Sequence, residues 1–309
     1  MLNDMQTAGD KGQFLLDSLQ QGDLGALARA ISLVENDRQG QLQWLSRLKG
    51  GGQADVIGIT GPPGAGKSTL VDLLIGRWVE AGKRIAVLCV DPSSPFHSGA
   101  LLGDRIRMRQ WYNHPQVYIR SLASRGALGG LNAKIIEITA LVSAAPFDVL
   151  LIETVGVGQN EVEIALLSET TVVVLVPETG DDIQAMKSGL LEIADILVVN
   201  KSDRPDAGRF LNQLRTAFGQ ADAAQPRPLA ILQTVATENQ GIDDLWAKIQ
   251  LHQQNKNDPE RKSRLLAEKA YQLLIRKRTA DIDKTQLLDA IRGQLNKSGF
   301  NFYAWLDQY

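Results

Sequence analysis

The chain has 309 residues, of which 44% are hydrophobic and 22% are charged, and its formal net charge at pH 7 is -2. This balance is typical of a folded globular protein and excludes disorder across most of the length. The slightly negative charge provides no broad basic surface, so we predict no general binding to nucleic acid.

Cysteine, histidine and long apolar segments are scarce in this sequence. The only cysteine is Cys89, and the three histidines, His97, His114 and His252, are far apart along the chain. A disulfide within the chain is therefore excluded, and a Cys/His metal cluster is not predicted. The first residues do not have the pattern of a signal peptide, and no apolar run approaches the roughly 20 residues of a membrane helix. We expect a cytoplasmic protein with no membrane partner.

Helical spacing characterises the first part of the chain. Between 14 and 48, apolar residues recur every three or four positions, with breaks at Gly22 and near Asp37. This pattern predicts two or three helices. Three glycines at 50–52 predict a flexible joint, so residues 1–49 are assigned to an N-terminal helical extension.

Apolar runs alternate with helical patterns from 50 to 252. Such alternation predicts an α/β fold, in which helices cover both faces of a mostly parallel sheet. The predicted strands are 56–60, 84–90, 117–122, 149–153, 171–176, 196–200 and 229–235. The predicted helices between them are 68–80, 131–144, 162–169 and 241–250.

A polar joint at 253–260 leads into a last helical region, from 262 to 306. Residues 253–309 are too few for a strong core of their own, so we predict that they pack on the sheet domain or join two subunits as a dimerisation segment. Aromatic residues are dense between Phe300 and Tyr309, as they are at many interfaces. We expect this end of the chain to dock on another subunit or on the main domain.

The sequence GPPGAGKS at 61–68 has the spacing of a phosphate-binding loop (P-loop), and it lies between a predicted strand and a predicted helix. Backbone N–H groups of such a loop point at an anion, and the helix N-terminus adds a favourable dipole. The Lys67 ammonium reaches the outer phosphates, and the Ser68 hydroxyl is placed for Mg²⁺. A plain glycine-rich turn is the alternative, but it does not account for Lys67 and Ser68. The predicted phosphate-binding residues are Gly61, Pro63, Gly64, Ala65, Gly66, Lys67, Ser68 and Thr69.

Acidic residues at the ends of predicted strands are candidate magnesium ligands. Asp91 and Glu153 each end a predicted strand, at the sheet edge where open α/β folds bind ligands, and Asp104 lies in the loop between them. Mg²⁺ prefers oxygen ligands and keeps several waters, so Ser68 and one or two of these carboxylates would suffice. An isolated Asp is more often a solvated residue or a helix cap, an alternative that applies to Asp104 more than to the two acids at strand ends.

The sequence ETVGVGQN at 153–160 follows a predicted buried strand and contains two glycines. Such a loop allows a backbone N–H to approach a γ-phosphate, so we interpret it as a nucleotide switch that includes Gly156. Gln159 is a candidate for positioning water, and an exposed turn residue is the equal alternative.

The sequence NKSD at 200–203 follows another apolar strand and predicts recognition of guanine. The Asp203 carboxylate can accept hydrogen bonds from the N1–H and the exocyclic amine, whereas adenine lacks this pair of donors. Asn200 can bond the base and neighbouring loops, and the stem of Lys201 can cover the ring. After the last strand, Thr234, Val235, Ala236 and Thr237 are predicted to form a backbone clamp for the base oxygen. Together with the P-loop, this motif predicts GTP and GDP as ligands.

The motifs above resemble those of the methylmalonyl-CoA mutase-associated GTPases of the MeaB/ArgK type, and the likeness extends over most of the chain. Four further blocks carry it: DPSSP at 91–95, GALGGL at 126–131, GDDIQ at 180–184 and EIAD at 192–195. The resemblance implies a homodimeric P-loop GTPase that escorts an adenosylcobalamin-dependent acyl-CoA mutase. It also implies that the GTPase gates cofactor delivery and protects the mutase.

The same resemblance implies roles for particular residues. Asp91, Asp104 and Glu153 match the metal-site acids of the family, and the segment 177–189 matches an additional switch that couples nucleotide state to the mutase. That switch contains Asp181, Asp182 and Lys187.

The predicted reaction is Mg²⁺-assisted attack of water on the γ-phosphate, with Lys67 and Glu153 as the catalytic candidates and a slow intrinsic rate. Two alternatives share the P-loop. A kinase for a small metabolite or a transport protein would not need the guanine selectivity of Asp203. A GTPase that inserts metal ions would call for a Cys/His cluster.

Overall fold

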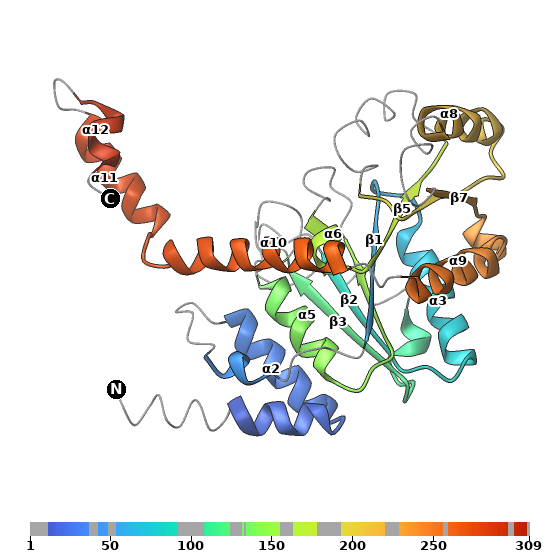
Figure 1. Cartoon of the computed structure of the whole chain (residues 1–309), viewed down its shortest axis with the longest axis horizontal. Helices are drawn as coiled ribbons and strands as arrows, with labels where there is room; N and C mark the ends of the chain where they lie inside the picture. Colours follow the sequence, from blue (N-terminus) through green and yellow to red (C-terminus); the bar gives the residue numbers. More distant parts are fainter. Residues whose placement is uncertain are drawn as a thin grey trace.

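The computed structural model describes residues 12–36, 43–48, 54–91, 108–123, 132, 134–154, 163–177, 193–219, 229–255, 259–295 and 300–307. Seven parallel strands form one sheet in the order β3-β2-β4-β1-β5-β6-β7 (Figure 1). Each coincides, within one or two residues at either end, with a strand predicted from the sequence. The strands are β1 (Asp55–Thr60), β2 (Ile85–Asp91), β3 (Val117–Ala123), β4 (Val149–Glu153), β5 (Thr170–Leu175), β6 (Ile196–Val199) and β7 (Ala230–Gln233).

Two of the central strands, β4 and β5, are buried along their whole length. This is why both read as continuous apolar runs rather than as alternating patterns. In the strand register, Glu153 at the end of β4 is opposite Ile59 of β1 and Cys89 of β2. The carboxyl ends of three neighbouring strands therefore meet at one edge of the sheet.

Helices cover both faces of the sheet (Figure 1). On one face, α3 (Lys67–Glu80) and α9 (Ile242–Gln254) share a core with β1, β2 and β5. On the other face, α2 (Leu24–Asn36), α5 (Ile135–Ala144) and the short α6 (Ile164–Leu167) form a second core. The predicted helices in these positions are confirmed, although α5 begins at 135 rather than 131 and α6 has only four residues.

One helix of the sheet domain has no counterpart in the prediction. α8 (Ala207–Gly219) packs against β5 and β6 through Phe210, Leu211 and Leu214, which form a small separate core with those strands. Most of its other side chains are exposed. Phe210, Leu211, Leu214 and Phe218 recur at helical spacing, so the sequence does carry the periodic signal for this helix, and the prediction missed it.

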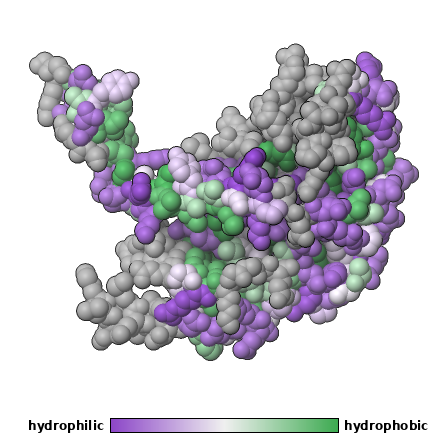
Figure 2. Space-filling view, viewed as in Figure 1, coloured by the Kyte–Doolittle hydropathy of each residue, from purple (hydrophilic) through white to green (hydrophobic). Residues whose placement is uncertain are grey.

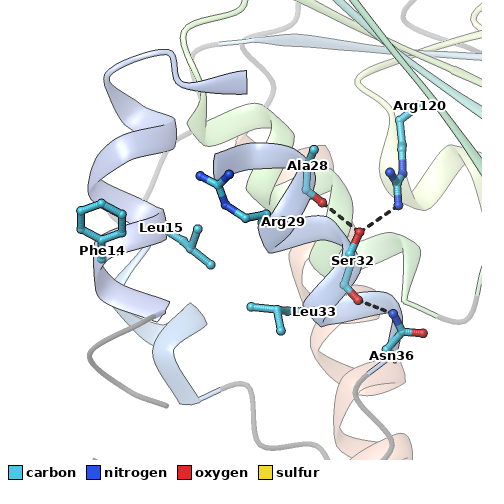
Figure 3. Close-up of a pocket in the computed structure, with 8 residues that line it drawn as sticks. All are labelled: Phe14, Leu15, Ala28, Arg29, Ser32, Leu33, Asn36 and Arg120. Carbon is cyan, nitrogen blue, oxygen red and sulfur yellow. Dashed lines mark hydrogen bonds between the residues drawn. The ribbon is translucent and has the colours of Figure 1, made fainter. Parts of the chain in front are cut away.

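The N-terminal helices belong to the body of the domain. α2 packs on α5, and Arg120 of β3 donates hydrogen bonds to Ser32 (3.2 Å) and to the Glu35 carboxylate (2.7 Å). Beside this contact, a groove of about 960 Å³ runs between the helix at 12–20 and α2, with Phe14 and Leu33 among its lining side chains (Figure 3). The predicted N-terminal extension is therefore joined to the sheet by apolar packing and by an ion pair.

The last helical region consists of three helices, α10 (Pro259–Arg278), α11 (Lys284–Leu295) and α12 (Phe302–Leu306). They form an arm that leaves the sheet domain, with α11 and α12 at its far end (Figure 1). Asp283 caps the start of α11 and Asn301 caps the start of α12. Within the described part of the chain, none of the helices is long and apolar enough to cross a membrane.

The aromatic group near the C-terminus lies at the far end of this arm, away from the sheet (Figure 1). Trp305 is 8% exposed, whereas Phe302 and Tyr303 are 46% and 76% exposed. In the described residues this group does not dock on the main domain, which was one of the two predicted positions. Docking on another subunit stays a prediction.

Asp195, which precedes β6, connects the sheet to the base of the arm. Its carboxylate accepts a hydrogen bond from the backbone N–H of Thr171 (2.8 Å) and two from the Arg261 guanidinium of α10 (2.7 Å each). His252 of α9 places Nε2 3.3 Å from the same carboxylate and Nδ1 2.9 Å from Thr170. Burial alone would raise the pKa of Asp195, but the hydrogen bonds and charges of His252 and Arg261 outweigh it and lower the pKa to about 2.

This lowered pKa predicts a loss of stability in acid. A carboxyl group with a pKa of about 2 in the folded chain and about 3.9 in the unfolded chain adds stability above pH 4 that disappears as the pH falls towards 2. The contribution is about 2–3 kcal/mol at neutral pH. Urea unfolding of wild type and Asp195→Asn should therefore give a free-energy difference that shrinks between pH 5 and pH 2. A difference that stays constant over this range would contradict the assignment.

Candidate functional site

The predicted P-loop connects β1 to α3, and its glycines have conformations that suit other residues poorly. Gly61, Gly64 and Gly66 have φ angles of 140°, 73° and 92°. A Cβ on Gly61 would lie 2.0 Å from the Val174 carbonyl oxygen, so this position also needs glycine for space. The loop ends where α3 begins, at Lys67, so the N–H groups of the first helical turn face the same region. This is the geometry of an anion-binding site.

Lys67 is held against the loop. Its ammonium donates to the carbonyl oxygens of Gly61 (2.9 Å) and Pro62 (3.0 Å), and the residue is only 6% exposed. A buried cation beside the N-terminus of a helix supplies the charge that outer phosphates require. The structure thus brings together the predicted phosphate-binding residues from 61 to 69 on one loop and one helical turn.

Ser68 and Glu153 meet at the carboxyl ends of the strands. The Ser68 hydroxyl donates a hydrogen bond of 2.6 Å to Oε1 of Glu153, and both residues are buried. A hydroxyl and a carboxylate are ligands that suit Mg²⁺, which needs few protein ligands because it retains waters. Asp91 ends β2 one strand away, but its side chain, like all of Asp104, lies outside the described residues. Among the described residues, no group of three or more His, Cys, Asp or Glu is placed to hold a metal ion.

A pair of threonines that sequence reasoning did not select fixes the exit of β4. Thr154 donates from its hydroxyl to Thr60 (2.9 Å), and its backbone N–H donates to the Ile59 carbonyl oxygen (3.1 Å). Both threonines are buried. This contact sets the starting point of the predicted switch at 153–160 beside the P-loop. The switch candidates themselves lie outside the described residues: Gly156, Gln159, Asp181, Asp182 and Lys187.

Asn200 connects the P-loop to the predicted base-binding loop. It is 2% exposed, and its amide donates to the Ala65 carbonyl oxygen (2.8 Å). Its Oδ1 accepts hydrogen bonds from the Thr234 hydroxyl (3.0 Å) and the Ala236 backbone N–H (3.2 Å). One side chain therefore joins the P-loop, 135 positions before it in the sequence, to the loop after β7, 34 to 36 positions after it. These hydrogen bonds are the contact with neighbouring loops that the sequence predicts for Asn200, and Thr234 of the predicted backbone clamp takes part in it.

The remaining residues of the base-reading motif surround this contact. Lys201 has a φ of 57°, a left-handed conformation that is uncommon for a residue with a side chain. The next N–H, that of Ser202, donates to the Thr234 carbonyl oxygen (3.1 Å), which ties the motif to the end of β7. Asp203 is exposed, so its carboxylate is accessible to a ligand. On the neighbouring loop, Val235 precedes η5 (Ala236–Glu238), which contains Thr237.

The contact between Gly66 and Asn200 leads to a stability prediction. A Cβ on Gly66 would lie 2.3 Å from Nδ2 of Asn200, whereas a Cβ on Gly64 would meet nothing within 4 Å. Both glycines have positive φ, so alanine costs about 1–2 kcal/mol of backbone strain at either position. Gly66→Ala should additionally break the Asn200 contact and lower the melting temperature and GDP affinity well below those of Gly64→Ala. Equal effects of the two substitutions would argue against this account.

Comparisons with known proteins all find GTPases of one family. Residues 27–287 match the family model described as "Methylmalonyl Co-A mutase-associated GTPase MeaB". A Pyrococcus abyssi protein named as a GTPase is 42% identical over 289 residues, which cover 92% of this chain and 86% of that protein. The GTPase ArgK of Escherichia coli is 36% identical over 244 residues, covering 75% of this chain and 72% of ArgK.

A solved structure has the same fold. The crystal structure titled "LAO/AO transport system kinase" superposes with a TM-score of 0.66 over 97% of this chain and 96% of that one. At 23% sequence identity this likeness concerns the fold alone.

Proposed function

This chain belongs to the family of methylmalonyl Co-A mutase-associated GTPases, MeaB, and we propose that it escorts an adenosylcobalamin-dependent acyl-CoA mutase. In this proposal the GTPase gates loading of the cofactor and protects the mutase from inactivation. The observation that carries it is the family match over 27–287 combined with one contact: Asn200 joins the P-loop to the guanine-reading motif at a single sheet edge.

GTP hydrolysis requires that charge on the transferred phosphoryl group be stabilised, and the P-loop residues are arranged for this task. The proposed roles are charge stabilisation by Lys67 and by the N–H groups of the loop, with water attacking the γ-phosphate. Bound Mg²⁺ supplies further positive charge at the outer phosphates. The ion would be held by Ser68 and Glu153, together with Asp91 and Asp104. The buried Ser68 hydroxyl and Glu153 carboxylate, which lie 2.6 Å apart, are consistent with this set of ligands. We also assign Glu153 to the catalytic machinery, since it is fixed beside the phosphate loop.

Guanine selectivity is proposed to reside in Asp203, supported by the surrounding framework. The exposed carboxylate would accept two hydrogen bonds from the base, and the stem of Lys201 would cover one face of the ring. Backbone groups from Val235 to Thr237 would contact the base oxygen. Buried Asn200 joins the loop at 200–203 to the loop at 234–237 through hydrogen bonds to Thr234 and Ala236.

The proposed output is a change in affinity for the mutase. Segments 153–160 and 177–189 would be ordered differently around GTP and GDP, as switch segments of other GTPases are. The role of GTP hydrolysis is then to end the GTP-bound state after a certain time, and not to supply a metabolic product. The anchoring of β4 by Thr60 and Thr154 supports this proposal, because it fixes the base of the first segment.

A homodimer is proposed on the basis of the arm. Its helices expose four large apolar side chains by more than half, namely Leu266, Tyr271 and Leu274 of α10 and Leu295 of α11. Apolar surface of this extent on a single helix and its neighbour is typical of a subunit interface. Light scattering should give the mass of two chains, and Leu274→Asp should shift the molecule towards the monomer. A monomeric wild type would contradict the proposal.

The function is tested by affinity capture from cell extract with the protein held in GDP or in a non-hydrolysable GTP analogue. Mass spectrometry should find an acyl-CoA mutase whose recovery depends on the nucleotide. A variant that cannot select guanine, Asp203→Asn, serves as the control and should lose the nucleotide dependence. Absence of a mutase in both states, with phosphate transferred instead to a small molecule, would favour the kinase alternative.

A further inference from the structure

The last turn of α3 bonds the loop that follows β7. Arg77 of this turn donates a hydrogen bond from Nη2 to Oδ1 of Asn239 (3.3 Å), and its Nε donates to the Asp243 carboxylate of α9. The Arg77 side chain is 21% exposed. α3 has 14 residues and is therefore about 20 Å long. One helix thus begins at the predicted phosphate site, at Lys67, and extends to the loop that is predicted to contact guanine.

The loop at 235–240, which contains η5, is closed at its base. The backbone N–H of Val235 donates to the Gln240 carbonyl oxygen (3.1 Å), and the N–H of Gln240 donates to the Val235 carbonyl oxygen (3.2 Å). Asn239 has a φ of 56°, a left-handed conformation that asparagine tolerates better than most residues with a side chain. Because its two ends are bonded to each other, the loop has little freedom of shape. Its position therefore depends on the contacts that join it to the rest of the domain.

Side chains from outside bond this loop at two separate places. On the buried side, Oδ1 of Asn200 accepts from the Ala236 backbone N–H (3.2 Å), and the Asn200 amide donates to Ala65 of the P-loop. On the exposed side, Arg77 bonds Asn239. Ala236 also packs in the same core as α3. Both side chains therefore relate the loop to the phosphate site, Asn200 by a direct bond to the P-loop and Arg77 through the helix that the P-loop begins.

We propose that Arg77 is a positioning residue for guanine, which acts through Asn239 and fixes the loop at 235–240 relative to the P-loop. The proposal rests on the proposed function and deepens it, because it assigns base affinity in part to a side chain on the phosphate-binding helix. A nucleotide occupies the phosphate site and the base site at the same time. Its affinity is highest when the two are held at the right separation before binding, since no ordering of the loop is then needed.

The expected effect is moderate because the contact lies near the surface. Figure 2 shows mainly hydrophilic residues on the visible surface around α3 and α9, and exposed polar contacts contribute less than buried ones. Arg77→Met removes the donor, and Asn239→Gly removes the acceptor while suiting the positive φ. Each should weaken GDP binding about threefold to tenfold. The double variant should bind GDP no more weakly than the single variants, because all three lack the same contact.

The test is a calorimetric titration of the full-length protein, in the presence of Mg²⁺, with GDP and with inorganic tripolyphosphate. Tripolyphosphate has no base, so Arg77→Met and Asn239→Gly should bind it as the wild type does. At saturating GTP both variants should keep the wild-type kcat while KM rises, because the residues at the phosphates are unchanged. A general loosening of α3 would instead weaken both ligands and lower kcat.

The matched control is Glu80→Gln, which removes the partner that Arg77 has on α3 itself, at 3.6 Å. It should bind both ligands as the wild type does. Unchanged GDP affinity in Arg77→Met and Asn239→Gly overturns the positioning role and leaves the GTPase intact. Equal losses for GDP and tripolyphosphate, or a lowered kcat, also overturn it, because Arg77 would then only stabilise the helix. A wild-type protein that does not bind GDP overturns the proposed function, and the role of Arg77 with it.

Discussion

Lys67→Ala is expected to lower the rate of GTP hydrolysis by roughly 10²- to 10³-fold, the usual effect of removing one positioned donor from a charged transition state. Lys67 is 6% exposed, and the carbonyl oxygens of Gly61 and Pro62 hold its ammonium in place, so little reorganisation is needed to stabilise the phosphate charge. Measured kcat should fall more than GTP affinity, because the charge it stabilises develops mainly in the transition state.

The matched control is Lys277→Ala, which removes an exposed lysine of α10 and should hydrolyse GTP at the wild-type rate. Circular dichroism must show that Lys67→Ala is folded, since it leaves two carbonyl oxygens without their cation. A folded Lys67→Ala protein with wild-type kcat would remove Lys67 from the catalytic machinery.

Much of the fold is predictable because the signals are local. A buried parallel strand is an apolar run, and β4 and β5 are such runs from end to end. The P-loop is similarly local, since its glycines, Lys67 and Ser68 occupy consecutive positions whose conformations their own residue types dictate. These features could be located to within one or two residues.

The contacts that turn these motifs into one site are not local, and no spacing rule predicts them. Asn200 bonds Ala65, about 135 positions away in sequence, and Thr154 bonds Thr60, about 94 positions away. Both pairs meet only because parallel strands bring their carboxyl ends to one edge. Threonine in a strand is also ambiguous in sequence, because its β-branched side chain suits a strand without any bond from the hydroxyl.

α10 shows a different limit of sequence reasoning. Its periodicity predicts a helix, but periodicity alone assigns the apolar stripe to the inside. The structure places Arg261 and Arg276 inside and Leu266 and Leu274 outside. The reason is the row of carboxylates on the domain, to which Asp195 and Glu137 belong, and those come from distant parts of the chain. Only the assembled surface determines which face of the helix is the inner one.

Asp203→Asn is expected to weaken GTP and GDP binding roughly 10- to 100-fold while the fold survives. A carboxylate can accept from both the N1–H and the amine of guanine, and loss of one charge-assisted hydrogen bond costs about 1.5–3 kcal/mol. The asparagine amide has one acceptor and one donor group, which matches a base that carries an N1–H beside a carbonyl oxygen. Xanthosine nucleotides have that pair. Competition assays should therefore show that the affinity of the variant for xanthosine nucleotides rises relative to its affinity for guanosine nucleotides.

The matched control is Asp206→Asn, which makes the same chemical change at an exposed residue of the same loop that pairs with Arg209. It should leave selectivity unchanged. Because Asn200 and Thr234 hold the loop from the buried side, the framework should be the same in both variants, and the melting temperatures should agree closely. If Asp203→Asn kept wild-type preference for guanine, the carboxylate would not contact the base, and selectivity would have to come from the backbone between Val235 and Thr237.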